Sequence, residues 1–147
     1  GNAIGNSSVI VRKNLISKIG GISENKNLVA SEDYHTWLRI AKISDQFTYL
    51  KKKLGYYLIH DKSAQKRDLS IPHREAINDF LKLFNNQQRL SLEVKLKYMS
   101  GNYNNLKNNF SRAKEDFKFV MKNGGVQFKI RSFLKFLLII IKNGKIS

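Results

Sequence analysis

Short apolar runs separated by polar stretches mark the first 68 residues, and their spacing predicts strands and short helices. Residues 7–11 (SSVIV), 47–50 and 55–59 are rich in β-branched or aromatic side chains, which is typical of short strands. Residues 12–19 predict a helix of one or two turns. A Gly-Gly pair follows it and predicts its end, because glycine readily adopts the left-handed conformation found there.

A second helix is predicted from residue 32 to residue 41. Ser31 suits the N-cap position, and Glu32 and Asp33 fall in the first turn, where the helix dipole favours negative charge. Large or apolar side chains then recur at steps of three and four, which predicts one face packed against a core. These side chains are Tyr34, Trp37, Leu38 and Ala41.

Every segment after residue 69 has the spacing of amphipathic helices. Pro72 suits the first turn of one helix. A second is expected to begin at Ser91 and end at Gly101, and a third to run on to the Asn-Gly-Gly sequence at 123–125. The predicted buried side chains of the first helix are Ile77, Phe80, Leu81 and Phe84, and those of the third are Tyr103, Leu106, Phe110, Ala113, Phe117 and Val120.

Residues 126–142 are the most apolar segment and predict an amphipathic terminal helix. It is too short and too charged to cross a bilayer, which takes about 20 apolar residues. Three interpretations are open: a helix that closes the helical bundle, an in-plane helix on a membrane surface, or a contact with a partner subunit. The polar side holds Gln127, Arg131, Lys135 and Lys142 with Leu138 among them, and the apolar side holds Ile130, Phe133, Leu137, Ile140 and Ile141.

A polar stretch at 61–68, followed by a proline at position 72, predicts a boundary between two parts. The predicted fold class is α+β and mainly helical. Residues 1–68 form the first part, with a few short strands. Residues 69–147 form the second, a helical hairpin or bundle that ends in the amphipathic helix.

The net charge of +16 narrows the range of partners. Residues 1–68 carry 12 basic and 6 acidic side chains, and residues 69–147 carry 15 and 5. Such an excess is typical of proteins that bind nucleic acid or an anionic membrane. The sequence has no zinc knuckle, RNP aromatic signature or Gly-x-x-Gly loop, which makes nucleic acid the weaker choice. The absence of cysteine excludes a disulfide framework and a thiolate zinc site.

The adjacent carboxylates Glu32 and Asp33 are the best candidates for catalysis. A charged carboxylate at hydrogen-bond distance from a sugar hydroxyl can act as its general base, and a helix start helps to keep a carboxylate charged near neutral pH. Simple stabilisation by the helix dipole accounts for the same two residues. The pair alone therefore leaves a catalytic and a structural role open.

Four segments in order carry a resemblance to a known family. They are residues 6–13 (NSSVIVRK), 19–22 (IGGI), 31–41 (SEDYHTWLRIA) and 54–63 (LGYYLIHDKS). Residues 3–63 thus resemble the second half of the catalytic domain of family 2 glycosyltransferases, which invert configuration and have the A-type fold. Residues 85–142 are similar to the helical tail that follows many such domains. The resemblance implies a truncated A-type fold.

The resemblance also implies roles on the acceptor side. Asp33 would take the proton from the acceptor hydroxyl, which then attacks the anomeric carbon of a nucleotide-sugar. Glu32 would orient the site or bind the acceptor. Trp37, one turn beyond Asp33, is either a core residue or a platform for the acceptor. We expect His35 and His73, which lie on predicted helices, to be solvated.

On the donor side, His60 matches a family histidine that lies near the donor diphosphate and its metal. The alternative is an ordinary histidine at the end of a strand. The family usually has arginine two residues earlier, where this chain has Leu58. Lys62 and Ser63 would then have to supply the missing phosphate contact.

The resemblance further implies parts that these residues lack. Family members bind the nucleotide in an N-terminal half, where an Asp-x-Asp motif holds a divalent metal, Mg²⁺ or Mn²⁺. This sequence has no Asp-x-Asp. We therefore expect a C-terminal fragment of a longer transferase that is inactive by itself. Strand edges exposed in such a fragment would favour a homodimer.

The expected function is transfer of a sugar from a nucleotide-sugar donor to a glycan or lipid-linked acceptor, in cell-surface polysaccharide synthesis. The expected location is the cytoplasm, and it is the inner face of the plasma membrane if residues 126–142 form a membrane contact. The alternative is a basic helical module that binds a membrane surface or nucleic acid without catalysis. In that case Glu32 and Asp33 only start a helix.

Overall fold

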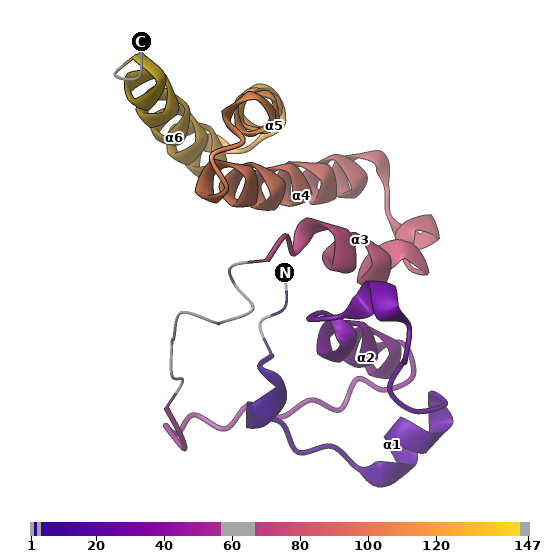
Figure 1. The fold of residues 1–147 in the computed structure, drawn as a ribbon. Helices are drawn as coiled ribbons and strands as arrows, with labels where there is room; N and C mark the ends of the chain where they lie inside the picture. The colour runs from indigo at the N-terminus through magenta and orange to yellow at the C-terminus, as the bar shows by residue number, and fades with distance from the viewer. Residues whose placement is uncertain (1, 3, 57–66, 145–147) are drawn as a thin grey trace.

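The computed structural model describes residues 2, 4–56 and 67–144, and the regular structure in these ranges is helical (Figure 1). Short 3-10 turns lie at Asn6–Ser8, Lys26–Leu28 and Leu81–Leu83. The helices are α1 (Lys13–Lys18), α2 (Glu32–Ala41), α3 (Ser70–Asn78), α4 (Asn86–Leu106), α5 (Phe110–Asn123) and α6 (Val126–Gly144).

The predicted strands are absent from the described residues, so the α+β class and the truncated A-type fold are wrong for this part of the chain. A strand is stable only when a neighbouring strand takes up its backbone hydrogen bonds. Val9 has extended backbone (φ −118°, ψ 138°) but no strand pairs with it in the described ranges. Residues 47–56 follow an irregular path that leaves Tyr49 and Leu54 exposed. Residues 57–59 of the third predicted strand lie outside the described residues.

The helices predicted in the first part are confirmed as α1 and α2. Gly20 and Gly21, which follow α1, have φ of 75° and 83°, the left-handed conformation that ends a helix. The Gly21 carbonyl accepts a hydrogen bond from Arg39 Nη1 at 3.0 Å. This bond ties the end of α1 to α2.

α4 is longer at both ends than the sequence predicts. It begins before Ser91 because Asn85 and Gln88 cap it reciprocally: Asn85 Oδ1 accepts from the Gln88 N–H at 2.8 Å, and Gln88 Oε1 accepts from the Asn85 N–H at 2.9 Å. α4 also continues through Gly101. A Cβ atom at Gly101 would come within 2.9 Å of the Phe117 ring of α5. The glycine therefore permits close helix packing and does not end the helix.

The third predicted helix is divided in the structure. Tyr103 and Leu106 belong to the last turn of α4, and α5 begins at Phe110. Between them Asn108 has φ of 58°, a conformation that asparagine tolerates better than most residues. The chain reverses there, so one amphipathic pattern continues across two antiparallel helices. α5 then ends at Asn123, at the Asn-Gly-Gly sequence where the end of the helix was predicted.

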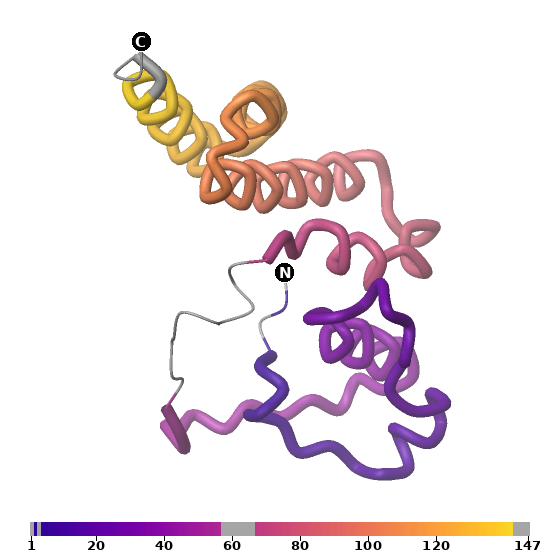
Figure 2. The backbone as a smooth tube through the Cα atoms, in the orientation of Figure 1, coloured from indigo at the N-terminus to yellow at the C-terminus, as the bar shows by residue number. Residues whose placement is uncertain are grey.

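Two apolar clusters lie along α4, which runs through the middle of the chain path (Figure 2). The first joins α2 and α3 to the N-terminal half of α4, and the second joins α5 and α6 to its C-terminal half. The first cluster contains Ile77, Leu92 and Leu96 with Tyr34, Leu38, Leu81 and Phe84 around them. The second contains Ala113, Phe117 and Ile139 with Tyr98, Phe110 and Phe136 around them.

The predicted terminal helix is confirmed as α6, and it packs along α5. In the part of the chain that the structure describes, no helix has both the length and the apolar character needed to cross a bilayer. α2 packs against α3, so contacts cross the predicted boundary at residue 68, which stays a prediction.

Candidate functional site

Asp33 lies in the first turn of α2, half-buried, with a hydrogen bond to each carboxylate oxygen. Asn2 Nδ2 donates to Oδ2 at 3.0 Å, and the Tyr34 N–H donates to Oδ1 at 2.7 Å. These bonds set the orientation of the carboxylate, and each oxygen keeps a lone pair for another donor. The positive end of the helix dipole favours negative charge at this position. The group is thus oriented and available to a hydroxyl that donates to it.

Glu32 has a different environment from Asp33. Its side chain is exposed, and its backbone carbonyl accepts a hydrogen bond from Thr36 Oγ1 at 2.7 Å. The structure therefore places the two predicted carboxylates side by side in the same turn, one oriented by the protein and the other in solvent. The two carboxylates are therefore not equivalent.

The residue before this pair connects α2 to α3. Ser31 is completely buried, and its Oγ lies 2.9 Å from Nδ1 of His73. Its hydroxyl does not cap α2, contrary to the predicted N-cap role, although Ser31 occupies the N-cap position. The preceding residue, Ala30, has φ of 71°. The buried hydroxyl pairs with the imidazole because it has no access to water.

No sequence pattern marked His73 as a site residue, and the prediction that it is solvated is wrong. It is half-buried, and its ring centre lies 5.4 Å from that of Tyr34. Burial lowers the pKa of His73, while the negative charge of Asp33 acts in the opposite direction. Burial also raises the pKa of Tyr34. No periodicity signal relates His73 to Ser31, because the two lie 42 residues apart.

His35 is also buried, which contradicts the prediction that it is solvated. Its Nε2 lies 3.7 Å from Asp79 Oδ2, at the end of α3. Trp37 is half-buried one turn after Asp33, and its indole Nε1 is enclosed without a hydrogen-bond partner in the described part of the chain. The Trp37 ring thus contacts protein on part of its surface and leaves the rest accessible.

The donor-side candidates His60, Lys62 and Ser63 lie outside the described residues. Within the described ranges, no three His, Asp or Glu side chains come together as a metal site requires. The Mg²⁺ or Mn²⁺ implied by the resemblance is expected at an Asp-x-Asp that this sequence does not contain, and it stays a prediction. The candidate residues that the structure describes are those around the start of α2.

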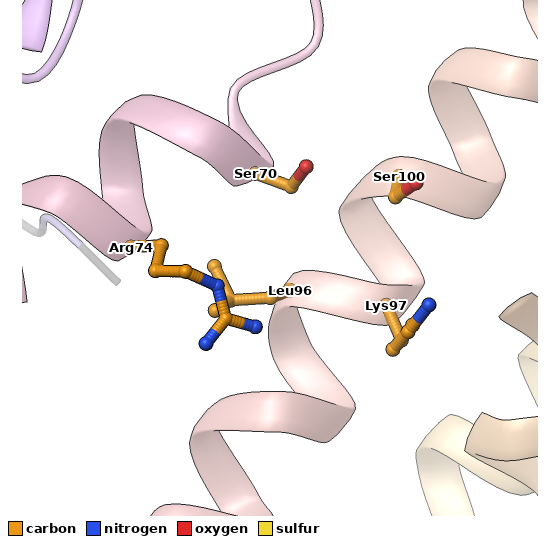
Figure 3. A pocket seen from close by; sticks show the side chains of 5 residues that line it. All are labelled: Ser70, Arg74, Leu96, Lys97 and Ser100. Carbon is orange, nitrogen blue, oxygen red and sulfur yellow. The ribbon is translucent and has the colours of Figure 1, made fainter. Parts of the chain in front are cut away.

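A small hollow of about 120 Å³ lies between α3 and α4 (Figure 3). Its cations are already paired: Arg74 donates two hydrogen bonds of 2.6 Å to Glu93, and Lys97 Nζ lies 2.9 Å from Asp116 Oδ1. The hydrogen bonds from Arg74 lower the pKa of Glu93. We therefore regard this hollow as part of the link between the helices. Its lining residues are Ser70, Arg74, Leu96, Lys97 and Ser100.

A larger open hollow of about 420 Å³ lies where the C-terminal half of α4 meets Lys135 of α6. The Lys135 ammonium donates a hydrogen bond to Asn102 Oδ1 and lies 5.6 Å from the centre of the Tyr98 ring. Burial lowers the pKa of Lys135. Arg67, the residue that follows the undescribed segment 57–66, also lines the hollow. The contacts of Lys135 hold α6 on α4.

No protein-family model, curated protein or solved structure matches the chain.

Proposed function

We propose that residues 1–68 supply the acceptor side of a glycosyltransferase, in which Asp33 is the general base, and that residues 69–147 are its helical C-terminal extension. The observation that carries the proposal is the Asp33 carboxylate, oriented by Asn2 and the Tyr34 N–H at the start of α2. The four ordered segments that resemble family 2 glycosyltransferases support it from the sequence. The proposal concerns the chemistry of the first turn of α2 and does not include the sheet of the A-type fold.

The reaction would be an inverting transfer. Asp33 accepts the proton of an acceptor hydroxyl, and the oxygen forms a bond to the anomeric carbon of the donor sugar. The bond from that carbon to the diphosphate oxygen breaks, and the nucleoside diphosphate leaves with the electron pair. Glu32, exposed beside Asp33, would bind the acceptor. The accessible part of Trp37 would contact the acceptor sugar.

The donor would be held by a nucleotide-binding part that these residues do not contain, since the sequence has no Asp-x-Asp. A divalent metal bound there would neutralise the leaving diphosphate. The acceptor would be a glycan or a lipid-linked glycan. We place the reaction in the cytoplasm, at the inner face of the plasma membrane.

The test is transfer by the full-length protein that contains these residues. UDP- and GDP-linked hexoses would be offered with a membrane lipid and glycan extract, and released nucleoside diphosphate and product configuration would be measured. The proposal predicts release that depends on the extract and a product of inverted configuration. Retention of configuration, or no release from any donor, would contradict it.

A further inference from the structure

α6 packs against the protein with one side and turns its most apolar side outward. Ser132 and Ile139 are completely buried on the packed side, and Phe136 is part of the second cluster. Eight apolar side chains on the other side are between 38% and 72% exposed. We call them the outer face of α6: Val126, Ile130, Phe133, Leu134, Leu137, Leu138, Ile140 and Ile141.

The outer face runs the length of the helix, and the exposed Gln127 interrupts it near the first turn. At 3.6 residues per turn these eight positions cover an arc of about 160°, centred opposite Ser132 and Ile139. A helix on a globular protein ordinarily buries its apolar stripe. α6 instead leaves most of its apolar side chains exposed. All five residues on the predicted apolar side are exposed, so closure of the bundle does not explain why this side is apolar.

Positive charges border the outer face on both edges. Arg131 and Lys142 lie at one edge and Lys129 at the other, and all three are exposed. Lys118 of α5 adds a cation at the second edge, where its Nζ lies 5.9 Å from the centre of the Phe136 ring. Residues 126–142 include no acidic side chain.

We propose that α6 lies in the plane of an anionic lipid surface. The outer face would sit among the acyl chains, and the bordering cations would meet the headgroups. An apolar arc with lysine and arginine at its edges is the pattern of an in-plane membrane helix, and each such cation near an anionic surface strengthens binding. α6 lies at the far end of the molecule from α1 (Figure 1).

Charge favours a lipid surface over a second copy of this chain. Two copies that paired through the outer face would bring Lys129, Arg131 and Lys142 close to the same residues of the other copy. α6 offers no acidic side chain to balance them. Nucleic acid would meet the cations but would leave the apolar arc without a partner. An anionic bilayer satisfies both features.

Flotation of the 147-residue chain with vesicles tests the proposal. Vesicles of pure phosphatidylcholine are compared with vesicles of phosphatidylcholine and phosphatidylglycerol in equal parts. We expect the chain to float with the anionic vesicles, to bind the neutral ones at least about tenfold more weakly, and to bind less when ionic strength rises from about 0.15 M to about 1 M. No sugar donor is present, so the result is separate from the transferase assay.

Two matched pairs of variants locate the contact. Ile130→Asp changes the outer face, and Ile22→Asp changes an isoleucine of nearly equal exposure (56% and 57%) far from α6. K129Q/R131Q/K142Q removes three cations beside the outer face, and R12Q/K13Q/K18Q removes the same types of charge near α1, where all three side chains are exposed. The α6 variants should lose at least about tenfold in binding, while both controls bind like the unsubstituted chain.

Circular dichroism of each variant confirms that helix content is unchanged, as expected for exposed positions. Failure of the unsubstituted chain to float with anionic vesicles would overturn the proposal. Equal loss in the α6 variants and their controls would do the same. A dimer in sedimentation that Ile130→Asp dissociates, without vesicle binding, would assign the outer face to a second copy.

Discussion

The hydroxyl oxygen of Ser31 lies 2.9 Å from Nδ1 of His73 and joins the start of α2 to α3. Ser31 is completely buried, so water does not compete for this bond. Asp33, the candidate base, lies two residues further along in the first turn of α2. Its position relative to α3 therefore depends on a hydrogen bond between residues 42 positions apart in the sequence.

Acidification should weaken the fold through His73. Burial lowers its pKa below the ordinary value of 6.5, so the unfolded chain binds the proton more readily than the folded chain. The contribution of His73 to the free energy of unfolding is complete above about pH 6.5, and it is lost as the pH falls through the pKa of the folded state. Urea unfolding of the chain and of His73→Gln should show a stability difference that shrinks below about pH 6.5. A difference that does not change with pH would contradict this role.

Gly101→Ala should destabilise the chain although alanine favours helix. The added Cβ would lie 2.9 Å from Cε1 of Phe117, which is completely buried and has little room to move. We expect a loss of about 1–3 kcal/mol in the free energy of unfolding. Gly55→Ala, where a Cβ has no neighbour within 4 Å, is the control and should change stability by less than about 0.5 kcal/mol. A stabilised Gly101→Ala chain would show that α4 and α5 are less closely packed.

The ion pair of Lys97 and Asp116 should contribute more to the free energy of unfolding than the ion pair of Arg74 and Glu93. Asp116 is buried and Lys97 is its partner at 2.9 Å, so Lys97→Met leaves a carboxylate without compensation, at a cost of about 1–3 kcal/mol. Arg74 and Glu93 are 48% and 35% exposed, and solvent screens them. Their coupling should stay below about 1 kcal/mol. Double-mutant cycles in urea measure both, and a reversed order would refute this ranking.

Periodicity along the chain predicted three of the helices near their observed positions because a helix is a local structure. α1, α2 and α6 lie where the spacing of apolar residues places them. The start of α4 was predicted too late, at Ser91, although the Asn85 and Gln88 cap marks the true start. The β-branched run at 7–11 led to a wrong strand prediction. A strand needs a neighbouring strand to pair with, and the residues of one segment do not show whether such a neighbour exists.

The site was predictable only in part, for the same reason. Adjacent carboxylates at a helix start marked Asp33 and Glu32 as candidates. The hydrogen bonds from Asn2 to Asp33 and from Ser31 to His73 join distant positions, and no local pattern reports them. The side of α6 that faces outward was likewise undetermined, since an amphipathic pattern does not show which side the protein covers.

The most direct test of the central claim is the turnover of Asp33→Asn in the full-length protein. Asp45→Asn, which changes an exposed carboxylate in the loop after α2, is the control. If Asp33 is the general base, its substitution lowers nucleotide-sugar turnover by about 10²–10⁴-fold, while thermal unfolding stays near that of the unsubstituted protein and the control keeps full activity. Unchanged turnover of Asp33→Asn in a folded protein would contradict the assignment.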